Sequence, residues 1–297
     1  MSMTEQLTKL RKDIRLAAVN LTENEARFLV DNYYIMQEDR KRAHNQERAL
    51  DDNKEPHEIV TWLAVNSKLL EEELKKVLGE YSNSKLIGRW MQSIVGIGPV
   101  ISAGYLAHID INETETVGQM WRFAGLDPTS KWLPKTKRPW NASLKTLCWK
   151  LGQSFLKFNN HENCIYGHLY KLRKKYEVDR NESGQNAEQA ARILTEKNFD
   201  KKTEAYKHLS KGRLPPAQID ARARRWTVKM FMSHLHIVWW FHTKKVLPIK
   251  PYVIGIMGHI DFIPPPNTGI IPGLTEALRK EYPNTQIPAD YYSIKYP

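Results

Sequence analysis

The spacing of apolar residues predicts two long helices in the first third of the chain. Residues 22 to 25, TENE, form a capping-box sequence, so a helix is expected to start there. Pro56 follows the break at DDNKE and occupies an expected first helical position, and this second helix is predicted to continue to about Leu78. The apolar positions of the two helices are Phe28, Leu29, Ile35 and Met36, followed by Ile59, Leu63, Leu70, Leu74 and Leu78.

Residues 1 to 85 are therefore predicted to form an antiparallel helical arm of coiled-coil-like build. Its helices are polar on most faces, and the segment QEDRKRAHNQER is almost wholly polar. Such an arm buries too little apolar surface to stand alone, so a partner chain is expected to cover part of it. We expect the arm to mediate a homodimer.

The rest of the chain is predicted to be helical up to residue 247. Apolar and aromatic residues concentrate between 86 and 175, polar residues between 176 and 213, and a strong helix is expected from about Gln218 to Lys245. From 248 to 297 the chain is rich in Pro and Gly, and only TEALRKEY there has a helical pattern. The expected fold class is all-α, with an arm (1–85), a compact helical domain (86–247) and an extended tail (248–297).

Charge narrows the choice of partners. The 297 residues include 45 Lys and Arg against 33 Asp and Glu, a formal net charge of +12, which favours a polyanion such as nucleic acid. No window approaches the ~18 apolar residues of a spanning helix, and the first residues lack the apolar stretch of a signal peptide. We expect a soluble, cytoplasmic protein without a membrane partner. Cys148 and Cys164 are expected to be buried thiols.

A glycine pair marks the first candidate contact with nucleic acid. Gly96 and Gly98 lie between two apolar helical segments, as in helix-hairpin-helix modules, where a bare backbone turn approaches a phosphate. A plain tight turn between packed helices is the alternative.

A basic loop with aromatic residues is the second candidate. Cations beside exposed aromatic rings suit phosphate contact combined with base stacking, although some of the tryptophans could belong to the core. The expected RNA-binding residues here are Lys131, Trp132, Lys135, Lys137, Arg138, Trp140 and Lys145.

Two basic helical segments complete the predicted interface. Arg173 and Lys174 belong to a run that is expected to end a helix, where the helix dipole alone also favours positive charge. Arg222, Arg225 and Lys229 share one face of the late helix because they are three and four residues apart. A solvated charged stripe is the alternative.

The order of motifs from residue 93 onward resembles a known family. SIVGIGPVISA is followed by HIDI at 108 to 111, then VGQMWRFAGLDP at 117 to 128, then Lys137-Arg138 and Leu144-Lys145. This order resembles the C-terminal domain of bridge-RNA-guided insertion-sequence transposases over residues 87 to 175. In those enzymes an acidic RuvC-like domain precedes the arm, whereas here the arm begins almost at the first residue. The chain is thus more similar to the stand-alone Tas proteins of TIGR systems, which carry a Nop-like domain.

This resemblance implies a non-enzymatic scaffold of bacterial or phage-infected cells: a homodimer bridged by its arms that holds a guide RNA pairing with target DNA. It leaves open whether a separate nuclease is recruited. Ser130 stands near the position of the transposase nucleophile but lacks the flanking glycines, and Pro139 replaces an expected Gly, so no catalytic residue is expected. The alternatives are a serine-type transposase fragment acting with a RuvC-like subunit, and a guide-independent DNA-binding protein.

Two further patterns are interpreted as decoys. The histidines at 234, 236, 242 and 259 lack carboxylates at ligand spacing, so no metal or other cofactor is expected. The segment 253 to 261 looks like a first RuvC strand with its acid, but the proline-rich remainder is too short to build such a core.

Overall fold

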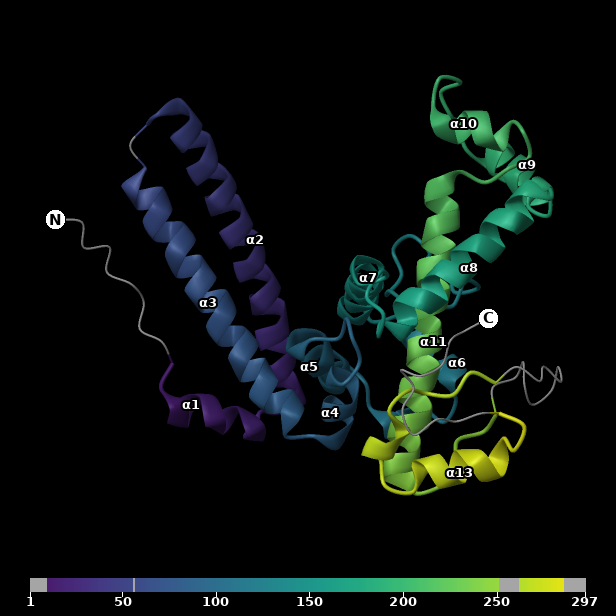
Figure 1. Ribbon diagram of the computed structural model, residues 1–297. Coiled ribbons are helices and arrows are strands. Elements are labelled where there is room, and N and C mark those ends of the chain that lie inside the picture. The colour runs from purple at the N-terminus through teal and green to yellow at the C-terminus, as the bar shows by residue number, and fades with distance from the viewer. Residues whose placement is uncertain (1–9, 56, 251–261, 286–297) are drawn as a thin grey trace. The chain divides into compact units, whose positions relative to one another are not determined.

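The computed structural model describes residues 10–55, 57–250 and 262–285, and within these ranges the chain contains helices and no strand (Figure 1). The expected all-α class is confirmed. The chain divides into two compact units, one of Met1–Ser93 with Ile97–Glu113 and the other of Ile94–Gly96 with Thr114–Pro297. The boundary expected at residue 85 falls inside the first unit. No helix of the described ranges is both long and apolar enough to cross a membrane.

The first unit is built on a hairpin of two long helices. They are α2 (Glu23–Asn53) and α3 (Glu58–Asn83), and they run antiparallel (Figure 1). The predicted capping box is confirmed, because the Thr22 hydroxyl accepts from the Glu25 N–H and the Glu25 carboxylate accepts from the Thr22 N–H. The second helix ends at Asn83 rather than at Leu78, and Pro56 lies outside the described residues. The shorter elements of this unit are α1 (Lys12–Leu16), η1 (Ala17–Asn20), α4 (Leu86–Gln92), α5 (Pro99–His108) and η2 (Ile111–Glu113).

Polar and apolar contacts hold the hairpin together at different heights. In its middle, the Glu71 carboxylate of α3 accepts from the Tyr33 hydroxyl at 3.1 Å and the Gln37 amide at 3.2 Å, and it pairs with Arg40. At its base, α5 packs against both α2 and α3, and Leu78 and Trp90 are fully buried. The arm therefore has an apolar core at the end where α4 and α5 pack against it. The sequence of the two long helices alone did not indicate this core.

The second unit is organised around one long helix, α11 (Pro216–Lys244), which packs against α6, α7, α8 and α13. An aromatic cluster forms its centre: the rings of Phe155 and Tyr166 stack at 4.7 Å, and Phe231 of α11 meets the Tyr166 ring edge-on at 5.6 Å. The remaining elements are α6 (Val117–Phe123), α7 (Ala142–Lys157), α8 (Ile165–Glu182), α9 (Ala187–Glu196), α10 (Glu204–Leu209), η3 (Thr268–Ile270) and α13 (Leu274–Glu281).

Two expectations for this unit are corrected. The basic run at 171 to 175 does not end a helix, because α8 continues to Glu182 and stops only before Ser183 and Gly184. The helix-dipole explanation for those charges therefore fails. The tail was expected to be extended outside TEALRKEY. The helix α13 confirms the helical pattern of that segment, but η3 is a further short helix that was not expected. Residues 251–261 and 286–297 of the predicted tail lie outside the described residues.

Cys148 and Cys164 are buried free thiols, as predicted. His234 is also buried and fully bonded within the second unit: its Nε2 lies 2.9 Å from the Ile263 carbonyl and its Nδ1 lies 2.7 Å from the Tyr166 hydroxyl. Because a carbonyl only accepts, Nε2 carries the proton and Nδ1 accepts from Tyr166. The neutral ring therefore satisfies both neighbours, and burial lowers the pKa of His234 to about 4.

This depressed pKa predicts a loss of stability in acid. Above the ordinary histidine pKa, both folded and unfolded chains keep the ring neutral. As the pH falls from about 6.5 towards 4, only the unfolded chain takes up the proton, so folding loses on the order of 3 kcal/mol. Urea unfolding at pH 7 and pH 4.5 should show that His234→Gln reduces this acid sensitivity. The exposed His161→Gln should leave it unchanged, and equal sensitivity in both variants would contradict the assignment.

Candidate nucleic-acid interface

The two glycines of the predicted hairpin have different surroundings. Gly96 has φ +97°, its carbonyl accepts from the Ser154 hydroxyl at 2.6 Å, and an added Cβ would lie 3.2 Å from the Phe155 ring. Its conformation and packing in the second unit therefore require glycine. Gly98 belongs to the first unit, precedes α5 and has nothing within 4 Å of an added Cβ. Contact of either glycine with nucleic acid stays a prediction.

The basic loop between α6 and α7 pairs cations with rings, as the sequence indicated. Arg138 lies 4.5 Å above the Trp132 ring, and the Lys145 ammonium lies 4.0 Å above the Trp140 ring. Trp132 is 51% exposed, so it is not a core residue. The close packing of Trp140 and Lys145 depends on Gly125, which has φ +66° and whose added Cβ would lie within 3 Å of both side chains.

The lysines of this loop are free of ion pairs. Lys131, Lys135 and Lys137 are all exposed, and none has a carboxylate within ion-pair distance in the described part of the chain. The Asn141 side chain caps α7 by accepting from the Leu144 N–H at 2.9 Å, which fixes where the loop ends. The loop thus presents unneutralised charge from a defined helix start.

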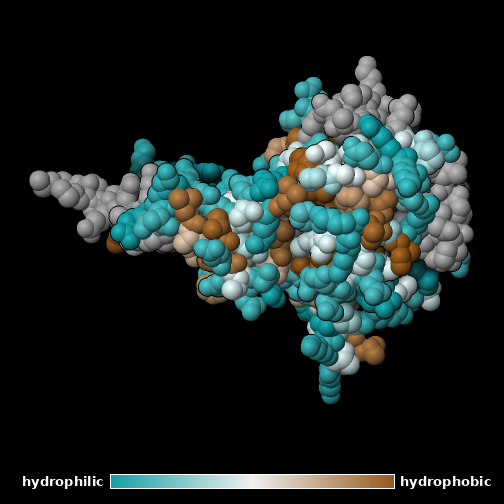
Figure 2. All heavy atoms as spheres, turned by 90° about the horizontal axis from the view of Figure 1, so that it is seen from below, coloured by the Kyte–Doolittle hydropathy of each residue, from teal (hydrophilic) through white to brown (hydrophobic). Residues whose placement is uncertain are grey.

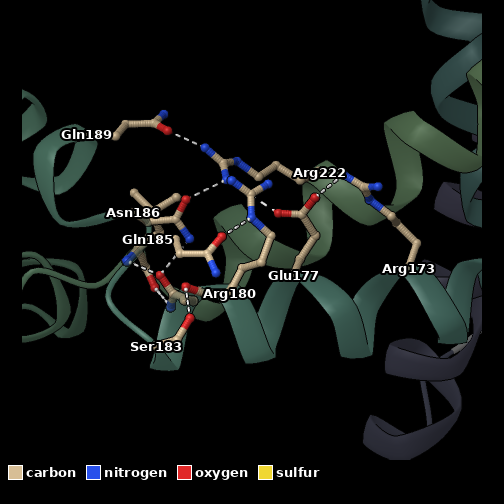
Figure 3. Close-up of polar contacts among 10 residues, drawn as sticks. Arg173, Glu177, Arg180, Ser183, Gln185, Asn186, Gln189 and Arg222 are labelled. Carbon is tan, nitrogen blue, oxygen red and sulfur yellow. Dashed lines mark hydrogen bonds and ion pairs between the residues drawn. The ribbon is translucent and has the colours of Figure 1, made fainter. Parts of the chain in front are cut away.

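The predicted arginines of α8 and α11 divide into bound and unbound ones, and Figure 3 shows the bound Arg173 and Arg222 on either side of Glu177. Glu177, whose side chain is 3% exposed, lies between Arg173 at 2.5 Å and Arg222 at 3.4 Å. Arg222 also donates to the Asn186 side chain at 3.0 Å and to Gln189. Arg173 and Arg222 therefore hold helices together, and the Glu177 carboxylate neutralises part of their positive charge.

Lys174 is bound in the same way. Its ammonium lies 3.0 Å from the Asp220 carboxylate of α11, which Arg224 also approaches at 2.7 Å. Hydrogen bonds with Asp220 and Tyr170 raise the pKa of Lys174. Arg173, Lys174 and Arg222 each form an ion pair within the protein. None of the three could bind a ligand through its full charge without breaking that ion pair.

The unbound cations crowd one another. Arg225 is exposed and has no carboxylate within ion-pair distance among the described residues, and Lys229 lies 4.8 Å above the Trp121 ring. Burial lowers the pKa of Lys145, and the charges of Arg138 and Arg225 lower it further. Although part of the Arg225 side chain is exposed, partial burial of its guanidinium likewise lowers its pKa, and the charges of Arg222 and Arg224 lower it further. An anion placed among these groups would relieve their mutual repulsion.

Two pockets adjoin this cationic cluster, and both are lined by Leu126, Pro128 and Arg225. The larger has a volume of about 500 Å³, and the smaller of about 450 Å³. The smaller contains Arg180, Lys229 and Trp226 beside the Glu177 network. The larger combines apolar side chains such as Leu126 and Val228 with Lys145, Arg224 and Arg225, and Asp127 also lines it. We call the two pockets together the basic groove.

No family model, curated protein or solved structure matches this chain. The basic groove is therefore described by its own geometry. The predicted site missed Trp149, Arg180 and Gly125, which line the groove or shape its edge. A signal for Trp149 exists in the sequence, because it follows Lys145 by four residues and so shares its helix face.

The remaining candidates for chemistry have structural partners. His236 bonds through Nε2 to the Thr114 carbonyl at 2.8 Å, and no group of three potential metal ligands occurs among residues 10–55, 57–250 and 262–285. His259 and the strand-like segment 253 to 261 lie outside the described residues.

Ser130 lines the larger pocket, with its hydroxyl 3.4 Å from the Asp127 carboxylate. Asp127 accepts from the Thr129 hydroxyl at 2.7 Å and from the Thr129 N–H at 2.9 Å, and these bonds lower its pKa. A carboxylate held in its ionised form is a weak base, so this neighbour does little to activate the serine.

The contrast between bound and unbound arginines is testable. Arg225→Ala should leave the free energy of unfolding within about 0.5 kcal/mol of wild type and lower the salt slope of binding to oligouridine by about one unit. Arg222→Ala should destabilise by about 3 kcal/mol, because Glu177 stays buried with one partner fewer. Urea unfolding and fluorescence polarisation at several salt concentrations measure both. An unchanged salt slope in Arg225→Ala would remove Arg225 from the interface.

Proposed function

We propose that this protein binds RNA along the basic groove of its second unit and acts as a scaffold rather than as an enzyme. The observation that carries the proposal is a set of cations that border two adjoining pockets and have no carboxylate within ion-pair distance among the described residues: Lys145, Arg225 and Lys229. Unneutralised, mutually repelling cations are stabilised by phosphates, which also release counterions on binding. The exposed ring of Trp132 beside Arg138 adds a surface on which a base can stack.

The guide role is the more specific part of the proposal. It rests on the resemblance of residues 87 to 175 to the Nop-like and transposase C-terminal domains. In this proposal the bound RNA is a small guide, target DNA is recognised by base pairing with it, and the complex works in the cytoplasm. A separate nuclease as a further partner stays open.

We propose a homodimer formed through the arm, supported by exposed apolar side chains. Ile59 of α3 is 82% exposed, and Leu63 follows it one turn later on the same side. Phe28 and Ile35 are likewise exposed on α2, seven residues apart. Figure 2 shows brown apolar residues among teal polar ones on the face of the arm that it displays. Covering this surface by a second copy would remove it from water.

Protein purified from cells that express its native locus should carry RNA of discrete length. Its absorbance at 260 nm should fall after ribonuclease and gel filtration, and sequencing of the extracted RNA should recover one small class. A nucleic-acid-free protein that also ignores those RNAs when they are added back would sink the guide proposal. Recovery of DNA instead would favour guide-independent DNA binding.

Cleavage separates the scaffold from the transposase alternative. Guide-matched, labelled DNA incubated with the loaded protein and magnesium or manganese should remain intact. If wild type cleaves it and Ser130→Ala does not, the chain is an enzyme.

Light scattering should give about twice the chain mass of 34.6 kDa. Ile59→Glu combined with Leu63→Glu should shift the protein to monomer without changing its helicity by circular dichroism, because both side chains face outward from the hairpin. Glu72→Ala, an exposed change on the same helix, serves as control. A monomeric wild type at micromolar concentration would contradict dimerisation through the arm.

A further inference from the structure

Trp149 is an exposed aromatic side chain without an aromatic neighbour. It is 62% exposed on α7, lines the larger pocket and has no ring or cation contact with the described residues. The other tryptophans near the groove have cations above them, as Trp140 has Lys145 and Trp226 has Arg173 at 5.3 Å. The Trp149 ring thus leaves a flat apolar surface uncovered at the pocket wall.

The pocket beside Trp149 is lined by both apolar and cationic side chains. Leu126 and Val228 contribute apolar surface, and Gly152 lets α7 approach α11 closely, since an added Cβ would lie 3.3 Å from Val228. Lys145 and Arg225 have no carboxylate within ion-pair distance among the described residues, whereas Arg224 is held by Asp220. Asp127, which also lines this pocket, pairs with Arg122 at 3.4 Å. The volume of about 500 Å³ lies within the range of small-ligand sites.

We propose that this pocket takes one unpaired nucleotide of the bound RNA, with its base against Trp149 and its phosphate at Lys145 and Arg225. The inference rests on the proposed RNA-binding function and adds the form of RNA that it requires. A nucleotide joins a flat ring to an anion, which matches the ring and the two cations of this site. A base paired and stacked inside a duplex does not present its face to a side chain, so the pocket selects an unstacked position.

The experiment compares three labelled probes of equal length: single-stranded oligouridine, the same backbone without bases, and an RNA duplex. Wild type should bind the oligouridine about tenfold more tightly than the base-free strand, since stacking on one aromatic side chain has this order of effect. Trp149→Ala should abolish that difference and leave affinity for the base-free strand and for the duplex unchanged. Trp149→Phe should restore most of it. Trp62→Ala, an exposed tryptophan of the arm, is the matched control and should have no effect.

The outcomes separate the two proposals. A wild type that binds none of the probes, and none of the RNA from its native locus, overturns the proposed function itself. Equal wild-type affinity for the oligouridine and the base-free strand overturns the nucleotide pocket while RNA binding stands. The same follows if Trp149→Ala weakens all probes alike, because Trp149 would then support the fold or the backbone contact rather than a base.

Discussion

The second unit depends on a buried carboxylate held by two arginines. Glu177 is nearly inaccessible, and a buried charge is tolerated only when it is paired and hydrogen-bonded. Arg173 comes from its own helix and Arg222 from α11, and Arg222 continues to Asn186 and Gln189 at the start of α9. One carboxylate thereby fixes three helices. Because Glu177 holds Arg173 and Arg222 in ion pairs, these two arginines are less able to bind a ligand than the cations that it does not contact.

The same long helix serves the core and the surface. Phe231 and Leu235 of α11 are fully buried, whereas Arg225 is exposed on another side of the helix. No carboxylate of the described residues lies within ion-pair distance of Arg225, and the charges of Arg222 and Arg224 add to the effect of burial in lowering its pKa. Such crowding opposes folding and favours anions. The core of the second unit therefore positions the basic groove, and the groove carries an excess of positive charge when no anion is bound.

Local patterns predicted the fold class, and long-range pairing limited the prediction of the site. The capping box at Thr22 follows from residues close in sequence and the burial of the two thiols from the small number of cysteines, and the structure confirms both. Arg222 pairs with Glu177, which lies 45 residues away in the sequence. Helical spacing placed Arg222, Arg225 and Lys229 on one face, but it could not indicate that a distant carboxylate neutralises Arg222 and not Arg225. The uninterrupted α8 was missed because its second half is polar, and packing against α11 extends it beyond the apolar segment.

If the basic groove binds RNA as proposed, the stability of the folded chain depends on that ligand. A ligand that binds only the folded state adds RT ln(1 + [L]/Kd) to the free energy of unfolding, about 2.7 kcal/mol when it is present at a hundred times its Kd. A polyanion in the basic groove supplies this gain and at the same time removes the repulsion among Arg225, Lys145 and Arg138. Empty molecules would therefore unfold more readily and meet proteases more often, so the cell would retain loaded molecules over empty ones.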